Sequence, residues 1–184
     1  MTAFAQVYSK SPAKLSEFGH PQGLGIPANT FTGFLMISAV VFGAFISFSG
    51  IYADKIGRRC FLIWVTFAML AFGLLMPQFL THGSPASVLA FLLIGMALMG
   101  LTFGPMAALL PELFPTEVRY SGASLAYNFA AIIGASIATL VAIELNAYYG
   151  IIGVGLYLAA NCVLTLLALN STHETKDVDL VDTQ

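Results

Sequence analysis

Five apolar stretches of about twenty residues, separated by short polar segments, most constrain how this chain can fold. Their only charged residue is Glu144, at the end of the fourth stretch. Each stretch is long enough for a helix to cross a hydrocarbon core about 30 Å thick, and strands are excluded because an open edge would leave backbone groups unpaired in lipid. The chain is therefore predicted to be an all-α membrane protein that lies in the lipid bilayer. The five expected transmembrane helices are 31–50, 61–80, 88–110, 121–144 and 151–169.

The amino-acid composition also indicates a membrane protein. Of the 184 residues, 58% are hydrophobic and 9% are charged, whereas a soluble domain carries about 25% charged residues. A globule of this size could not hide so much apolar surface from water. The net charge of −2 gives no reason to expect a nucleic-acid partner.

The reactive side chains do not form a catalytic or metal-binding pattern. The two cysteines are isolated, and the three histidines fall outside the expected spans. No span offers a nucleophile together with a base. We therefore expect no catalytic residues, no metal and no cofactor, and we predict that the chain is not an enzyme.

The remaining residues divide into two ends. Residues 1–30 contain three prolines and cannot span as one helix, although 1–9 is apolar and could be the last turns of a helix. We expect 1–30 to be periplasmic and 170–184 to be a cytoplasmic tail, because basic residues concentrate on the cytoplasmic side. That side would hold Lys55, Arg58, Arg59, Arg119 and Lys176, against Lys10 and Lys14 on the other.

The stretch "GIYADKIGRR" (50–59) gathers several charges between two uncharged spans. Gly50 suits a close approach of two helices, and Gly57 suits the left-handed turn that ends a helix. Arg58 and Arg59 can donate to carboxylates, and Asp54 can accept. The alternative is a charged turn whose only role is to set the orientation of the chain in the membrane.

A second loop carries charges on the same side. Gly104 and Pro105 fall inside a span, where they are expected to bend the helix or, alternatively, to allow close packing. Pro111 and Pro115 are expected to end that helix. The loop then holds Glu112, Glu117 and Arg119 opposite Arg58 and Arg59. We predict an ion-pair network between the two loops that closes this face of the membrane and opens as the helices move.

Tyr127, Asn128, Gly104 and Pro105 are the candidates for the substrate pathway. Asn128 would lie about 10 Å into its helix at 1.5 Å per residue. Its amide could bond a substrate in a central cavity, or it could make a bond between helices.

These motifs resemble a known family. Gly50, Asp54, Gly57, Arg58 and Arg59 fit the G-x-x-x-D-x-x-G-R-R loop signature of the major facilitator superfamily. The segment "PELFPTEVRYSGASLAYN" (111–128) resembles the loop between the tenth and eleventh helices in its metabolite–proton symporter branch, which carries shikimate, alpha-ketoglutarate, citrate or proline/betaine. The tail "HETKDVDL" (173–180) is also similar to that branch.

The resemblance covers about 31–180 and implies helices eight to twelve of a twelve-helix fold, with a remnant of helix seven in 1–9. It implies an N-terminal six-helix half as a partner that this chain does not contain. It also implies a multi-pass protein of the bacterial inner membrane that acts as a secondary active transporter. The expected activity is proton-coupled symport of a small organic acid or zwitterionic metabolite by alternating access.

Two points qualify this expectation. No span holds an Asp, Glu, Lys, Arg or His near its centre, so the proton-coupling group is expected in the other half. The alternative is a structural or regulatory membrane fragment of a truncated transporter gene that does not itself transport.

Overall fold

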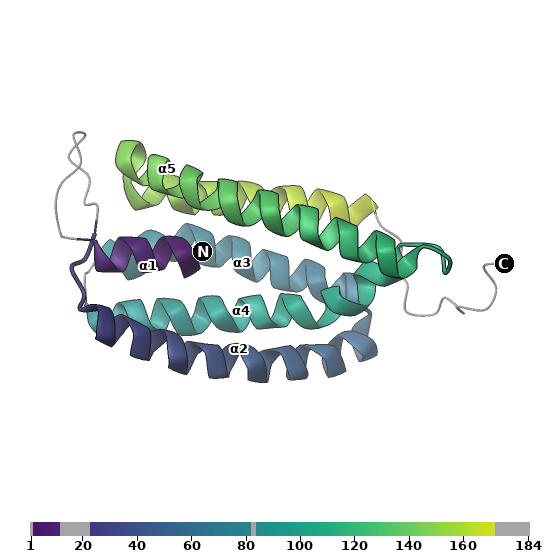
Figure 1. Ribbon diagram of the computed structural model, residues 1–184. Helices are drawn as coiled ribbons and strands as arrows, with labels where there is room; N and C mark the ends of the chain where they lie inside the picture. Colours follow the sequence, from purple (N-terminus) through teal and green to yellow (C-terminus); the bar gives the residue numbers. More distant parts are fainter. Residues whose placement is uncertain (1, 12–22, 82–83, 172–184) are drawn as a thin grey trace.

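The computed structural model describes residues 2–11, 23–81 and 84–171. These residues form helices and contain no strand, and the long helices lie side by side in a bundle (Figure 1). The expected all-α membrane fold is confirmed. The helices are α1 (Thr2–Lys10), α2 (Ala28–Ile56), α3 (Arg58–Thr81), α4 (Pro85–Glu112) and α5 (Arg119–Ser171).

Helices α2 to α5 are each long and apolar enough to cross a bilayer. The 53 residues of α5 would extend about 80 Å as one rod, more than twice the hydrocarbon thickness. The helix is broken at Gly150, where φ is 69° and ψ is −168°. Its N-terminal arm (119–149) turns back into its C-terminal arm (151–171) at this break (Figure 1). The described chain therefore supplies the five long helical segments that the apolar stretches predicted.

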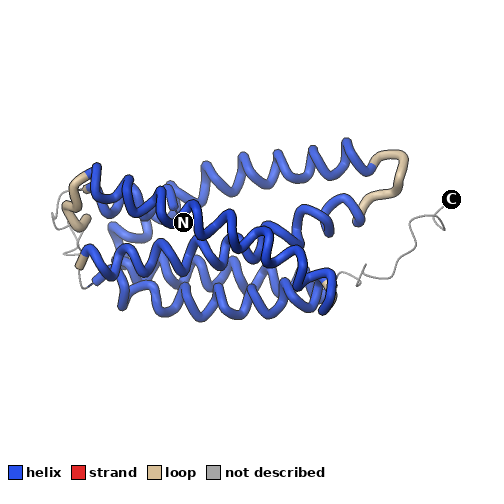
Figure 2. The backbone as a smooth tube through the Cα atoms, turned by 90° about the horizontal axis from the view of Figure 1, so that it is seen from below, coloured by secondary structure: helices blue, strands red, loops and turns tan. Residues whose placement is uncertain are grey.

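The helices extend further than the apolar stretches, which corrects two expectations. The charged stretch 51–60 is not a loop, because α2 continues through Ile56 and only Gly57 separates it from α3. Pro111 does not end α4, which runs on to Glu112. Polar residues continue a helix outside the hydrocarbon as readily as apolar ones, so hydropathy marks the membrane and not the end of the helix. The loops that the structure describes lie at the two ends of the bundle (Figure 2).

Helix α1 falls where a short helix was expected. Its last carbonyl groups accept from the segment that leads into α2: Leu24 N–H donates to the Tyr8 carbonyl (3.1 Å) and Ile26 N–H to the Ser9 carbonyl (2.8 Å). These bonds satisfy acceptors that a helix end otherwise leaves open. They fix α1 at the end of the bundle where α2 begins.

The packing is closest in two helix pairs. Helix α4 lies along α2, and α3 lies along α5. In the second pair a β-carbon on Gly155 would lie 2.6 Å from the Gly73 carbonyl oxygen, so the backbones touch there. The larger hydrophobic core lies at the α1 end of the bundle and includes Phe31, Met76, Leu80 and Leu92.

Candidate functional site

Gly57 sets the geometry between α2 and α3. Its φ of 106° lies in the region that favours glycine, and its N–H donates to the Ala53 carbonyl at 2.9 Å. The Gly57 carbonyl then accepts from Phe61 at 3.0 Å, which opens α3. The positive φ expected of Gly57 is present, but its ψ of 132° differs from that of a left-handed helical turn. The turn places Asp54 in the last turn of α2 and Arg58 in the first turn of α3.

Arg58 joins three helix ends. Its Nη2 lies 3.1 Å and its Nε 3.2 Å from Asp54 Oδ1, while Nη1 donates to Glu112 Oε1. Asp54 lies in the last turn of α2, and Glu112 is the last residue of α4. One guanidinium thus bridges carboxylates from two other helices, and we call these three residues the Arg58 cluster.

The two contacts of Arg58 differ in strength. The side chains of Arg58 and Glu112 are 21% and 20% exposed, whereas that of Asp54 is 63% exposed. An exposed ion pair contributes about 0 to 1 kcal/mol, and a hydrogen bond to a charged group away from water contributes about 1.5 to 3 kcal/mol. Glu112 is therefore the stronger partner, and the cluster mainly ties α3 to α4.

Arg59 forms hydrogen bonds with a different helix, α5. Its Nε donates to the Leu169 carbonyl at 2.7 Å and its Nη2 to the Asn170 carbonyl at 3.1 Å. Such carbonyls at the C-terminal end of a helix lack partners within the helix, and a positive charge there also favours the helix dipole. Sequence reasoning missed this contact because it joins residues 110 positions apart.

The loop between α4 and α5 does not make the ion pairs that were predicted for Glu117 and Arg119. Arg119, the first residue of α5, donates from Nε to the Phe114 carbonyl of the preceding loop at 3.4 Å, and Glu117 is exposed. Neither residue forms an ion pair within the described part of the chain. Of the charges predicted to join Arg58 from this loop, Glu112 alone does so. The reason is that it still belongs to α4, whereas the others follow a turn.

Gly104 marks close packing of α4 on α2. A β-carbon there would lie 2.8 Å from the Ile46 carbonyl oxygen and against Ser49, while Pro105 is buried inside the helix. Ser49 Oγ contacts the carbonyls of both Ile46 (2.8 Å) and Gly100 (3.2 Å). The close-packing glycines here therefore belong to α4.

Gly50 lies where two helices pass closely, as expected, because a β-carbon on Gly104 would lie 3.0 Å from the Gly50 nitrogen. The missing side chain of Gly50 is not what permits this approach. A β-carbon on Gly50 would meet nothing within 4 Å. The close approach of α2 and α4 is instead permitted from the α4 side, because the α4 glycines face the α2 backbone.

Tyr127 and Asn128 lie on the N-terminal arm of α5. Asn128 is exposed and its Nδ2 donates to the Ser124 carbonyl of its own helix at 2.8 Å. The alternative of a bond between helices does not match this contact. Tyr127 and Leu110 help to line a cavity of about 300 Å³ between α4 and α5. Leu110 lies two positions before Glu112 in the chain. Neither Tyr127 nor Asn128 has a charged partner among the described residues.

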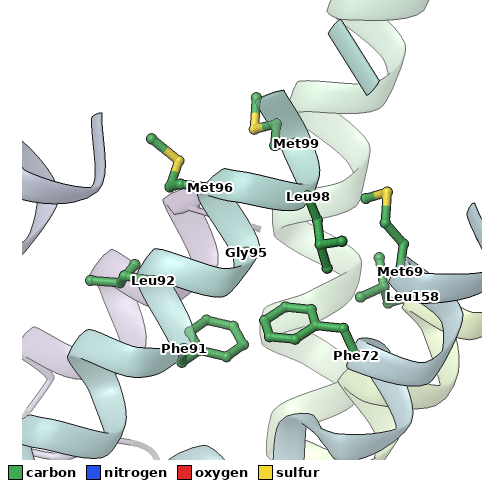
Figure 3. A pocket seen from close by; sticks show the side chains of 9 residues that line it. All are labelled: Met69, Phe72, Phe91, Leu92, Gly95, Met96, Leu98, Met99 and Leu158. Atoms are coloured by element: carbon green, nitrogen blue, oxygen red, sulfur yellow. The ribbon is translucent and has the colours of Figure 1, made fainter. Parts of the chain in front are cut away.

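A separate cavity of about 70 Å³ lies where α3, α4 and the C-terminal arm of α5 meet (Figure 3). The side chains of Met69, Phe72, Phe91 and Leu158 surround it, and Gly95 leaves room on α4. All of its lining side chains are apolar. It therefore offers nothing to a polar metabolite. Among the described residues, no group of three His, Cys, Asp or Glu side chains could hold a metal ion.

Comparison with known proteins adds to this geometry. The family profile described as "Sugar (and other) transporter" matches residues 22–184. A Haemophilus influenzae protein provisionally named as a metabolite transport protein is 68% identical over 182 residues, which is 99% of this chain and 42% of that protein. The inner membrane metabolite transport protein YhjE of Escherichia coli is 48% identical over 98% of this chain and 40% of its own length.

A more distant relative is the proline/betaine transporter of Salmonella typhimurium, 31% identical over 78% of this chain and 29% of that protein. The chain thus spans less than half the length of these relatives. No solved structure matches it. The matched profile, the relatives and the long apolar helices together show that the chain is a multi-pass membrane protein of the sugar (and other) transporter family within the major facilitator superfamily.

Proposed function

We propose that this chain forms helices eight to twelve of a secondary active transporter of the bacterial inner membrane. The transporter would move a small organic acid or a zwitterionic metabolite together with protons, by alternating access. Relatives named for metabolite, proline/betaine and cis,cis-muconate transport support this class of cargo. The observation that carries the proposal is the Arg58 cluster, in which one side chain holds the ends of three helices.

The Arg58 cluster acts as a gate at the cytoplasmic face. Closure needs contacts that are strong in one arrangement and easily broken in another. The partly buried bond to Glu112 supplies the strength, and the exposed position of Asp54 lets water replace its contact. The excess of basic residues at this end supports a cytoplasmic location.

An N-terminal six-helix half would complete the transporter. The N-terminal arm of α5 exposes apolar side chains, and Tyr127 and Asn128 lie on the same arm. Covering this arm with a second half would place both residues at the interface between halves, where such transporters bind cargo. The exposed apolar residues are Leu125, Phe129, Ile132, Ile133, Ile137 and Leu140.

The test is uptake of labelled proline, betaine and dicarboxylates into proteoliposomes that contain the chain joined to its N-terminal half. We expect uptake of at least one cargo under an inward proton gradient and its loss when a protonophore collapses that gradient. Uptake indifferent to the gradient would contradict symport. No uptake of any cargo by a folded protein would favour the alternative of a structural or regulatory fragment.

A further inference from the structure

Two further cavities lie one after the other along the N-terminal arm of α5. The outer cavity, of about 150 Å³, lies between α1 and this arm, at the end of the bundle opposite Arg58 (Figure 1). The inner cavity, of about 180 Å³, lies between the two arms of α5 and the first turn of α1. On the N-terminal arm, Gly134 to Ala142 line the inner cavity and Ile143 to Ala147 line the outer one, so the two cavities occupy consecutive turns of one helix.

Together the two cavities reach from one membrane face to the middle of the membrane. The break at Gly150 marks that face, because α5 turns back there (Figure 1). Ala138 and Asn161 line the inner cavity about a dozen residues from Gly150, which is roughly 18 Å at 1.5 Å per residue. Half of the hydrocarbon thickness is about 15 Å. The inner cavity therefore lies at the depth where secondary transporters bind their cargo and coupling ions.

Hydroxyl and amide groups line both cavities, unlike the apolar cavity shown in Figure 3. The Tyr8 hydroxyl lies at the outer cavity, and it has no hydrogen-bond partner among the described residues. Tyr8 is only 1% exposed, and a buried polar group in this condition is rare and indicates a bound partner such as water. The other polar lining residues are Ser11 and Asn146 in the outer cavity and Thr139, Tyr157 and Asn161 in the inner cavity.

The size and the lining of both cavities suit ordered water. A single water needs a cavity of about 10 to 15 Å³, so each of these cavities has room for several. Buried water sits where polar groups can bond it, whereas apolar cavities stay dry. Chains of such water move protons between groups that are too far apart for direct transfer. A row of water in these two cavities would therefore carry protons as well as solvent into the membrane.

Phe4 separates the two cavities. Its side chain lines both of them and is buried. The ring stacks on Tyr8 with the two centroids 5.7 Å apart and an interplanar angle of 22°, which holds it in place. An apolar constriction between two wet regions gates by excluding water. The row of water is thus interrupted at one aromatic side chain.

We propose that the two cavities form a water path by which protons reach the middle of the membrane from the face opposite Arg58, and that Phe4 is its constriction. The path brings protons to the depth of the cargo without passing the Arg58 cluster. The coupling group that is expected in the N-terminal half would receive them there. The proposal rests on the proposed transport function and names the route of its coupling ion within this chain.

The test is the reaction of single cysteines with silver ion, a small water-soluble thiol reagent, in the chain joined to its N-terminal half in proteoliposomes. Cys60 and Cys162 are first changed to serine. Ala147→Cys then reports on the outer cavity and Ala138→Cys on the inner one. The matched control is Ala160→Cys, at an exposed position of the C-terminal arm of α5 that lines neither cavity. Fluorescent maleimide added after denaturation counts the thiols that silver left unreacted, so the readout does not depend on transport.

Ala138→Cys should react at least about tenfold faster than Ala160→Cys, because the reactive thiolate forms in water and not in hydrocarbon. Adding Phe4→Ala should speed the reaction of Ala138→Cys several-fold, and Phe4→Trp should slow it, because the constriction is widened or narrowed. Neither change should alter the reaction of Ala147→Cys, which lies on the outer side of Phe4. Circular dichroism confirms that each variant keeps its helix content.

Two results would overturn the proposal. If Ala138→Cys reacted as slowly as Ala160→Cys even with Phe4→Ala, the inner cavity would be dry. If its reaction rate were the same in both Phe4 variants, water would reach it by another way. The expected pattern without proton-driven uptake of any cargo would leave the water path standing and contradict symport. Proton-driven uptake with an unreactive Ala138→Cys would contradict the water path alone.

Discussion

Arg58 and Arg59 are neighbours in the chain, yet each bonds to a different helix. Arg58 pairs with carboxylates at the ends of α2 and α4, and Arg59 donates to the carbonyls of Leu169 and Asn170 at the end of α5. Successive residues in a helix point about 100° apart, so one arginine cannot replace the other. A change in either residue should therefore loosen a different part of the same membrane face.

Arg59→Ala should fray the last turn of α5. Loss of two charge-assisted bonds and of the charge near the helix end removes about 1 to 2 kcal/mol of local stability. Amide hydrogen exchange over 165–171 should then rise by about tenfold, since 1.4 kcal/mol is a factor of ten. Arg58→Ala is the matched control and should leave these amides protected. Equal protection of this segment in Arg59→Ala and the unchanged protein would show that the contact does not stabilise α5.

At the scale of helices, the contact between α2 and α4 depends on glycine in α4. A β-carbon at Gly104 would press against backbone atoms of α2, which cannot rotate away as a side chain can. Gly43 lies on α2, and a β-carbon added there would meet nothing within 4 Å, so its surroundings are open. The two glycines therefore separate the effect of close packing from the intrinsic preference of a helix for alanine.

Gly104→Ala should destabilise the bundle by about 1 to 3 kcal/mol, because the helices must move apart. Gly43→Ala should be neutral or stabilising by up to about 1 kcal/mol, because alanine favours a helix. Thermal unfolding of both variants in detergent measures the difference. If Gly104→Ala unfolded at the same temperature as Gly43→Ala or above it, the close packing of α2 and α4 would be disproved.

The number and type of these helices were predictable, but their ends and partners were not. Uncharged stretches of membrane length located all five segments, since lipid leaves the backbone few alternatives. The stretch around Gly57 was expected to be a loop, because hydropathy falls there although the helix continues. The bond between Arg58 and Glu112 followed from opposite charges at one membrane face. The bond of Arg59 to the α5 carbonyls could not be predicted in this way. Every residue has a backbone carbonyl, so the sequence does not indicate which of them accepts a bond.

For the whole molecule, the charged contacts and the exposed apolar faces lie on different parts of the bundle. The Arg58 cluster joins helix ends at one face, while the N-terminal arm of α5 presents apolar residues outward along its length. Breaking the cluster frees α4 at that face without disturbing the larger core, which lies at the other end. The central claim is therefore that Arg58 holds this face closed.

The most direct test measures the distance between spin labels at residues 56 and 113, which are exposed at the ends of α2 and α4. Pulsed electron spin resonance on the chain joined to its N-terminal half gives the distance distribution. We expect one narrow distribution in the unchanged protein, a shift to longer distances in Arg58→Gln, and little change in Asp54→Asn because Asp54 is exposed. An Arg58→Gln distribution identical to that of the unchanged protein would contradict the claim that Arg58 holds this face closed.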